Sequence, residues 1–297
     1  MSENTKNDLS KVPAVTLTFW VVKILATTLG ETGGDAVSMS MNLGYVIASI
    51  IFLGIFAAVV AAQIAAKSFY PFLYWAVIVA TTTLGTTLAD FADRSLGIGY
   101  AGGSSLLLIL LMASLGIWYK SVGSVSVETI TSPKVEMFYW GTILFSQTLG
   151  TALGDWMADT NRVGYEGGAL VFAAGLALVA AAYFFSSVSR TLLFWAAFIL
   201  TLPLGATLGD LLDKPVAHGG FAFSRYSASG ILAASYLPAS CSFVKRPEAI
   251  PAEVRKLHEL AANLARASSL ISLLPRAHAD WLRFCYRNSC ISQVFHK

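Results

Sequence analysis

Charged residues are scarce in this chain. They make up 12% of its 297 residues, about half the share that a soluble globular domain carries. Apolar residues make up 56% of the sequence and form long runs, between residues 18 and 240, that few charges interrupt. The mean hydropathy is +0.65. This composition argues against an ordinary soluble domain and predicts an integral membrane protein with the lipid bilayer as its partner.

Cysteine and histidine are rare as well. The three cysteines lie in the C-terminal tail without the spacing of zinc ligands, so we predict neither a disulfide framework nor a thiolate metal site. His218, the single histidine of the apolar part, is interpreted as a loop residue. The net charge of +3 includes no dense basic patch in the apolar part, so no nucleic acid partner is expected.

Motifs of common enzyme classes are missing too. The chain has no G-x-S-x-G nucleophile turn, no H-E-x-x-H metal-binding helix and no G-x-x-x-x-G-K-[ST] phosphate loop. The first two absences argue against an intramembrane enzyme, and the third excludes a self-contained P-loop pump. We therefore predict that the chain is not an enzyme and binds no cofactor.

What the chain does have is a fourfold internal repeat. Each unit opens with an aromatic–Trp pair, a Leu-Gly pair begins nine residues after that Trp, and an aspartate follows the glycine by five residues. The motif reads TTLGETGGD in the first unit and TTLGTTLAD, QTLGTALGD and LPLGATLGD in the others. The units start 55, 65 and 55 residues apart, which groups them into two halves. The motif aspartates are Asp35, Asp90, Asp155 and Asp210.

Each unit holds two apolar segments of about 20 residues, enough for two membrane-spanning helices. Backbone exposed to lipid must satisfy its own hydrogen bonds, so the segments are expected to be helical. We predict an all-α membrane protein of eight transmembrane helices, built from four two-helix repeats and with pseudo-twofold halves. The expected spans are residues 14–37, 43–66, 71–92, 98–119, 136–158, 164–186, 191–212 and 219–240.

The predicted domain organisation follows from these spans. A cytoplasmic N-terminal segment (1–13) precedes repeats one and two (14–120), and a linker (121–135) leads to repeats three and four (136–240). The tail (241–297) is atypical, because the eighth span turns into a mixed sequence rich in charge. We hypothesise that residues from about 238 do not belong to the repeat sequence, as the result of a frameshift or of an unusual extension. An amphipathic piece at 252–274 is expected to lie at the membrane surface or to stay poorly ordered.

With two helices per unit, every unit enters the membrane from the same side, and the motif aspartates share one face. Loops between units carry Lys67, Lys120, Lys134 and Arg190, whereas loops within units carry Arg94, Arg162 and Lys214. The positive-inside rule then predicts cytoplasmic termini and aspartates toward the outer half of the membrane. The motif tryptophans are expected in the aromatic belt at the inner interface.

Small residues four apart accompany each aspartate, a pattern that lets membrane helices approach closely. We interpret helix packing as their main role. The pairs are Gly30 and Gly34, Gly85 and Ala89, Gly150 and Gly154, and Gly205 and Gly209.

The aspartates allow two interpretations. A carboxylate at mid-membrane costs about 2.5 to 3.5 kcal/mol and usually faces a bundle interior or a watery cavity. The alternative is a solvated helix end, with aspartate as a turn former. Three units carry a second aspartate for the turn itself, namely Asp93, Asp159 and Asp213, which favours the first interpretation.

The first unit departs from the other three at two positions. Glu31 stands where they have Thr86, Thr151 and Ala206, and Lys23 stands where they have Ile78, Ile143 and Phe198. We interpret Lys23 as a side chain that reaches the inner interface. Glu31 and Asp35 are four residues apart on one helix face, which is the elementary form of a cation or proton site. The predicted cation path is Glu31, Asp35, Asp90, Asp155 and Asp210.

Other polar residues surround this path. Glu166 and Arg225 are two more ionisable groups that pair either with each other or with the aspartates. Hydroxyl groups add hard oxygen ligands suited to Mg, Ca, Mn or alkali ions, although about half are expected to bond to their own helix. These hydroxyls belong to Thr27, Thr28, Thr32, Thr82, Thr83, Thr86, Thr87, Thr148 and Thr151.

The aromatic–Trp pairs, TTLGETGGD with its three copies, and the Gly-Tyr pairs at Gly44, Gly99 and Gly164 carry a resemblance to a known family. Over about residues 15 to 230, the chain resembles the bacterial inner-membrane proteins known as a four-fold repeat of unknown function. The resemblance implies an eight-helix bacterial membrane protein and brings no established activity. The stretch GETGGD is also similar, over six residues, to the acidic signature of some cation/proton exchangers.

Two functions remain open from the sequence. The first is secondary transport of a small cation, with divalent metals among the candidates, coupled to protons. The alternative is a membrane scaffold or sensor subunit without transport. An oligomer is compatible with either function.

Overall fold

The computed structural model describes residues 11–130, 132–160, 163–216 and 219–241. The tail with its predicted amphipathic piece, and also Arg162 and His218, lie outside the described residues.

Eight α-helices of 17 to 24 residues make up most of the described chain, and the described residues include no strand. The predicted all-helical fold is therefore confirmed. The first helix of each repeat is α2 (Leu17–Asp35), α4 (Pro71–Asp90), α6 (Pro133–Asp155) or α8 (Arg190–Asp213). The second is α3 (Gly44–Ala65), α5 (Gly99–Val122), α7 (Gly164–Phe185) or α9 (Arg225–Cys241).

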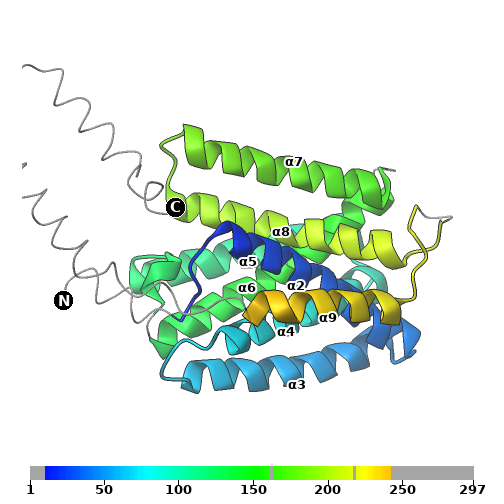
Figure 1. The fold of residues 1–297 in the computed structure, drawn as a ribbon, viewed down its shortest axis with the longest axis horizontal. Helices are drawn as coiled ribbons and strands as arrows, with labels where there is room; N and C mark the ends of the chain where they lie inside the picture. The colour runs from blue at the N-terminus through cyan, green and yellow to red at the C-terminus, as the bar shows by residue number, and fades with distance from the viewer. Residues whose placement is uncertain (1–10, 131, 161–162, 217–218, 242–297) are drawn as a thin grey trace, which may run out of the picture. The chain divides into compact units, whose positions relative to one another are not determined.

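The helices lie side by side with their axes roughly parallel, and helices that follow one another directly, such as α7 and α8, run in opposite directions (Figure 1). The four first helices form a closed inner ring in which α2 packs on α4, α4 on α6, α6 on α8, and α8 on α2. Each second helix packs outside this ring against the first helix of the following repeat: α3 on α4, α5 on α6, α7 on α8, and α9 on α2. Every repeat therefore covers its neighbour.

The motif glycines lie where inner helices touch, because only a residue without a Cβ fits there. A Cβ atom at Gly85 would lie 2.9 Å from the backbone nitrogen of Thr148. The predicted packing role of these glycines is confirmed around the whole ring. The contacts join Gly30 to Thr82, Gly85 to Gln147 and Thr148, Gly150 to Leu202, and Gly205 to Thr27.

The inner helices of the first three repeats continue beyond the motif aspartate as a π-helical turn, at Ala36–Ser40, Phe91–Ser95 and Trp156–Thr160. A short connection then leads to the outer helix, whose first residue is Gly44 (φ +73°), Gly99 (φ +70°) or Gly164 (φ +68°). Glycine adopts this left-handed conformation without strain. The turn geometry thus explains the repeated Gly-Tyr pair.

The eighth helix begins at Arg225, six residues later than the expected span. The preceding loop folds back on the end of α8 instead of continuing the helix. The backbone N–H of Phe221 donates to Leu211 O at 2.7 Å, and that of Phe223 donates to Leu212 O at 2.9 Å. These bonds satisfy carbonyls that the end of a helix leaves unpaired.

Aromatic side chains close the end of the ring opposite the aspartates. Trp75 is fully buried, Trp140 is 2% exposed and Trp195 is 4% exposed. The expectation of an aromatic belt is therefore wrong for these three tryptophans, because they pack against aromatic rings of neighbouring repeats. The hydroxyls of Tyr74 and Tyr139 share a hydrogen bond of 2.7 Å within the same cluster.

Five helices are long and apolar enough to cross a membrane: α3, α4 with its π-helical turn, α5, α7 and α8. The outer ones leave large apolar side chains exposed, such as Ile50 at 65%, Leu178 at 72% and Phe185 at 89%. The inner ring, by contrast, places most of its polar and ionisable side chains in the interior.

Candidate functional site

The four motif aspartates meet at one end of the inner ring. Each is at most 3% exposed: Asp35, Asp90, Asp155 and Asp210. Each lies near the C-terminal end of an inner helix, because the repeat keeps the same spacing from the helix contact to the aspartate. The prediction that they share one face is confirmed, and the interpretation as solvated turn formers is wrong.

Two basic side chains bridge these aspartates across repeat boundaries. Lys214 Nζ lies 2.8 Å from Asp35 Oδ2 and 2.9 Å from Asp210 Oδ1. Arg94 places Nε 3.2 Å from Asp90 Oδ1 and Nη2 3.0 Å from Asp155 Oδ2. Each base follows its own aspartate by four residues and also pairs with the aspartate of the next repeat.

Lys214 lies just beyond α8, where its ammonium is surrounded by carboxylates. Burial lowers the pKa of Lys214, but attraction to Asp210 and Asp35 outweighs burial, and the net effect raises the pKa above its ordinary value. The lysine therefore stays an ammonium and occupies the space between the two carboxylates.

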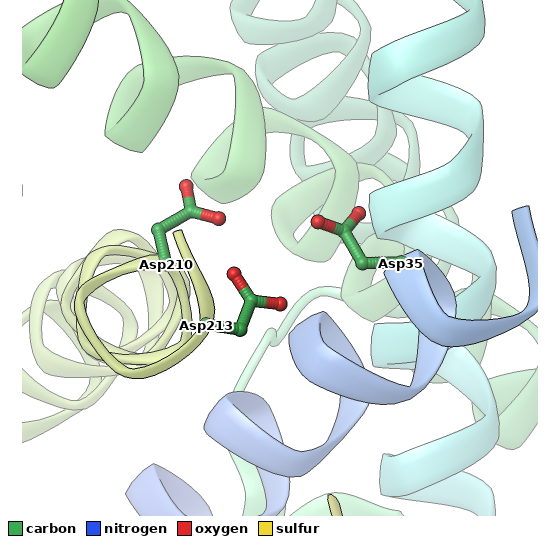
Figure 2. A group of neighbouring side chains, drawn as sticks. All are labelled: Asp35, Asp210 and Asp213. Atoms are coloured by element: carbon green, nitrogen blue, oxygen red, sulfur yellow. The ribbon is translucent and has the colours of Figure 1, made fainter. Parts of the chain in front are cut away.

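Asp213 joins the same group from the end of α8. The carboxylates of Asp35, Asp210 and Asp213 converge (Figure 2), and one oxygen from each lies within 4.8 Å of the others. Arg225 Nε lies 3.2 Å from Asp213 Oδ2 and 3.6 Å from Asp35 Oδ2. A metal ion at this point would compete with the Lys214 ammonium for the same oxygens.

The two open pairings of Arg225 and Glu166 are now decided. Arg225 pairs with aspartates, whereas Glu166 is exposed in the first turn of α7.

Asp93 is 7% exposed, and within the described ranges neither of its carboxylate oxygens has a hydrogen-bond partner. Carboxylates therefore outnumber cations at this end of the ring.

Glu31 lies one helical turn below the aspartates and points into the centre of the ring. It is 3% exposed, and its Oε2 accepts hydrogen bonds from Thr86 at 2.9 Å and from Thr151 at 3.0 Å. These threonines occupy the positions of Glu31 in repeats two and three. On a third side, Gly209 leaves room, since a Cβ there would lie 2.9 Å from the Glu31 Cβ. The carboxylate thus reaches from α2 across to α6, on the axis of the ring.

Comparison with known families accounts for the repeat. The family model described as Repeat of Unknown Function (DUF347) matches residues 18–69, 73–124, 138–189 and 193–237. The chain belongs to this family. Each match begins one residue before an aromatic–Trp pair, so the four repeats inferred from the sequence, and their register, are confirmed. No curated protein and no solved structure matches the chain.

The fourth DUF347 match ends at residue 237 and is shorter than the other three. The prediction that family sequence stops at about residue 238 agrees with this limit. The proposed frameshift itself stays a prediction.

Most threonines of the DUF347 motif form hydrogen bonds to the backbone of their own helix. Of the nine singled out in the sequence, only Thr86 and Thr151 donate to a carboxylate. The other seven donate to backbone carbonyls three or four residues earlier in their own helices, as Thr28 does to Ile24 O at 2.9 Å. The structural share of these hydroxyls is therefore larger than the expected half.

Lys23 does not reach an interface, and its predicted position is wrong. The side chain is fully buried, and it contacts α8, which packs against α2. Its Nζ donates to Thr201 Oγ1 at 2.7 Å and to Phe198 O at 3.3 Å, and it lies 3.9 Å from the centroid of the Phe198 ring.

Sequence reasoning missed Arg94, Lys214 and Asp213 as members of the aspartate group, whereas it left the pairing of Arg225 with the aspartates open as an alternative. A signal for the first two was present in the DUF347 repeat. Arg94 and Lys214 are 120 residues apart, and each follows a motif aspartate by four residues. A base at that spacing can fold back on its own helix and neutralise the aspartate.

Proposed function

We propose that this chain is a multi-pass membrane protein that carries a small cation across a bacterial inner membrane in exchange for protons. The observation that supports this function best is Glu31, a buried carboxylate on the ring axis. It accepts hydrogen bonds from Thr86 and Thr151 but has no basic partner among the described residues. Such a carboxylate needs a proton or a cation beside it.

The membrane assignment rests on the outer helices. Their exposed leucine, isoleucine and phenylalanine side chains suit lipid tails, and five helices have the required length and hydropathy. At the aromatic end, Lys67, Lys120, Lys134 and Arg190 are all exposed. Arg94 and Lys214, at the aspartate end, are engaged in ion pairs. This asymmetry supports cytoplasmic termini and aspartates toward the outer side.

The ion pairs also support two pseudo-twofold halves. Arg94 and Lys214 occupy equivalent positions 120 residues apart in the two halves, and so do Asp90 and Asp210. The link from Arg94 to Asp155, in the following repeat, then corresponds to the link from Lys214 to Asp35, where the ring closes. Repeats two and three therefore share Arg94, and repeats four and one share Lys214.

The excess of carboxylates gives a chemical basis for exchange. A cation entering from the aspartate end meets Asp35, Asp210 and Asp213 before Glu31. Carboxylate and hydroxyl oxygens are hard ligands, so magnesium, manganese, calcium and alkali ions are the candidates. Binding at Glu31 would release its proton, because proton and cation compete for the same oxygens.

One observation favours the alternative, a scaffold or sensor subunit without transport. The bridges made by Lys214 and Arg94 tie neighbouring inner helices together and already neutralise part of the acidic cluster. In that case the buried charges would serve to fix the helix arrangement.

The test compares a bacterial strain lacking this protein with the same strain complemented by wild type or by Glu31→Gln. Glutamine keeps the size of the side chain and can still accept hydroxyl hydrogen bonds, but it has no charge. We expect one metal to accumulate or run short in the strain that lacks the protein. Wild type should restore its level and Glu31→Gln should not, in growth across a panel of metal salts with cellular metal read by mass spectrometry.

Glu166→Gln is the matched control, because it removes an exposed carboxylate from α7 and should behave as wild type. Membrane levels of all variants are compared by immunoblot. If no metal level changes in any strain, the transport proposal fails and the scaffold function is favoured.

A further inference from the structure

Repeat one contributes two ionisable groups to layers that the other repeats fill with neutral residues. Lys23 belongs to a layer with Ile78, Ile143 and Phe198, and Glu31 lies eight residues further along the same helix. The proposed transport function uses Glu31 and the aspartates but leaves Lys23 without a role. A fully buried lysine is costly to keep merely to fill space that isoleucine fills in two other repeats.

The surroundings of Lys23 can hold its amine but provide no opposite charge. The amine donates to Thr201 Oγ1 and to Phe198 O and lies over the Phe198 ring. The Thr201 hydroxyl in turn donates to Phe198 O at 2.8 Å. No carboxylate of the described chain forms an ion pair with Lys23.

Other ionisable groups near this end of the ring are bonded elsewhere. Tyr74 of α4 shares its hydroxyl hydrogen bond with Tyr139, and Tyr236 of α9 donates to Trp75 O at 2.8 Å. From α8, only the neutral groups of Phe198 and Thr201 bond to the amine. Glu31 is therefore the ionisable group through which we expect Lys23 to respond, because it is the nearest one along the shared helix α2.

Eight residues of helix separate Lys23 from Glu31 by about 12 Å along the axis. Two unit charges at this distance, with an effective dielectric constant of about 20, change each other's equilibrium about tenfold. A divalent ion that displaces the Glu31 proton adds one net positive charge at this level, so its effect on Lys23 is also about tenfold. The effect is reciprocal, so an ion near Glu31 weakens proton binding at Lys23 as much as the ammonium weakens ion binding.

Building on the proposed transport function, we propose that Lys23 carries a second exchanged proton, which leaves its ammonium for the solvent when a cation binds at the level of Glu31. The products are a neutral amine and a hydrated proton, so the step needs no other reactant. Lys23 then sets how many protons are exchanged for each cation.

The test measures protons released by the purified full-length protein in weakly buffered solution when Mn²⁺, Mg²⁺ or Na⁺ is added alone. A pH indicator reports the protons, and equilibrium dialysis reports the bound ion. For a divalent ion that binds wild type, Lys23→Met should release fewer protons per bound ion, by up to about half a proton for a tenfold coupling. It should also bind that ion about tenfold more tightly at a pH where the lysine is charged.

Lys23→Arg separates this role from a structural one. It also replaces Lys23→Met in the test if the methionine variant does not fold. Arginine keeps its charge at all accessible pH values. It should therefore release as few protons as Lys23→Met, but without the gain in affinity. Ile78→Met, a change in the same layer that removes no charge, should match wild type in both measurements.

The outcomes separate this inference from the function on which it rests. If a divalent cation binds wild type and the Lys23 variants release as many protons as wild type, the inference is overturned and the transport proposal stands. If none of the three ions binds wild type, while the protein is folded, the cation site and the role of Lys23 fail together.

Discussion

Alanine in place of Gly85 is expected to lower the free energy of unfolding by about 2 to 3 kcal/mol, near the upper end of the cost of overpacking. The new methyl group would lie 2.9 Å from Thr148 N and 3.0 Å from the carbonyl carbon of Gln147. Both atoms belong to the backbone of α6, so α4 and α6 must move apart. Thermal unfolding of the purified protein, followed by circular dichroism in one detergent, measures the effect.

Gly54→Ala provides the matched control, because a Cβ at Gly54 in α3 would meet no atom within 4 Å. Alanine there should be neutral or stabilise by up to about 1 kcal/mol, since it is the better helix former. Equal unfolding temperatures for the Gly54 and Gly85 variants would contradict the close contact between α4 and α6.

Lys214→Met is expected to destabilise the protein by about 3 to 5 kcal/mol, the usual cost of removing one partner of a buried ion pair. The change leaves Asp35 and Asp210 buried without the ammonium that lies between them. Adding Asp210→Asn should recover part of this loss, because it removes one of the stranded charges. The free energy of unfolding of the two variants measures both effects, and Lys67→Met, at an exposed position, should have no effect.

The pH dependence gives an independent check of the same contact. The folded-state pKa of Lys214 is raised, so its contribution to stability is complete below the ordinary lysine value of about 10.4. That contribution is lost as the pH rises from this value through the folded-state pKa. Wild type should therefore lose stability relative to Lys214→Met above about pH 10. A constant difference between the two proteins from pH 7 to 11 would contradict the ion pair.

The repeat made much of the fold predictable. Aromatic–Trp pairs, glycines and aspartates at constant spacing fix the register along each inner helix, and equivalent residues therefore lie at the same level of the ring. This reasoning correctly placed the four aspartates together and assigned Gly85 and its equivalents to helix contacts. It needed no knowledge of which helices are neighbours.

Neighbour relations are what the sequence could not supply. Periodicity shows that Lys214 is close to Asp210 but not that Asp35, 179 residues away, completes its environment. The same limit explains the error at Lys23. A lysine three residues past an interfacial tryptophan would reach the membrane surface on an outer helix, but ring closure places it in the interior. The π-helical turns also carry no recognisable sequence signal.

The order in which the helices cover one another gives α9 particular importance. The helix at the C-terminal side of the described chain, α9, is packed on the helix at the N-terminal side, α2. Ser229 Oγ of α9 bonds to Thr32 Oγ1 of α2 at 2.9 Å, between Glu31 and Asp35 in the sequence. During synthesis α2 therefore stays uncovered on this side until α9 is made. Any genetic change that alters α9 acts directly on the helix that carries Lys23, Glu31 and Asp35.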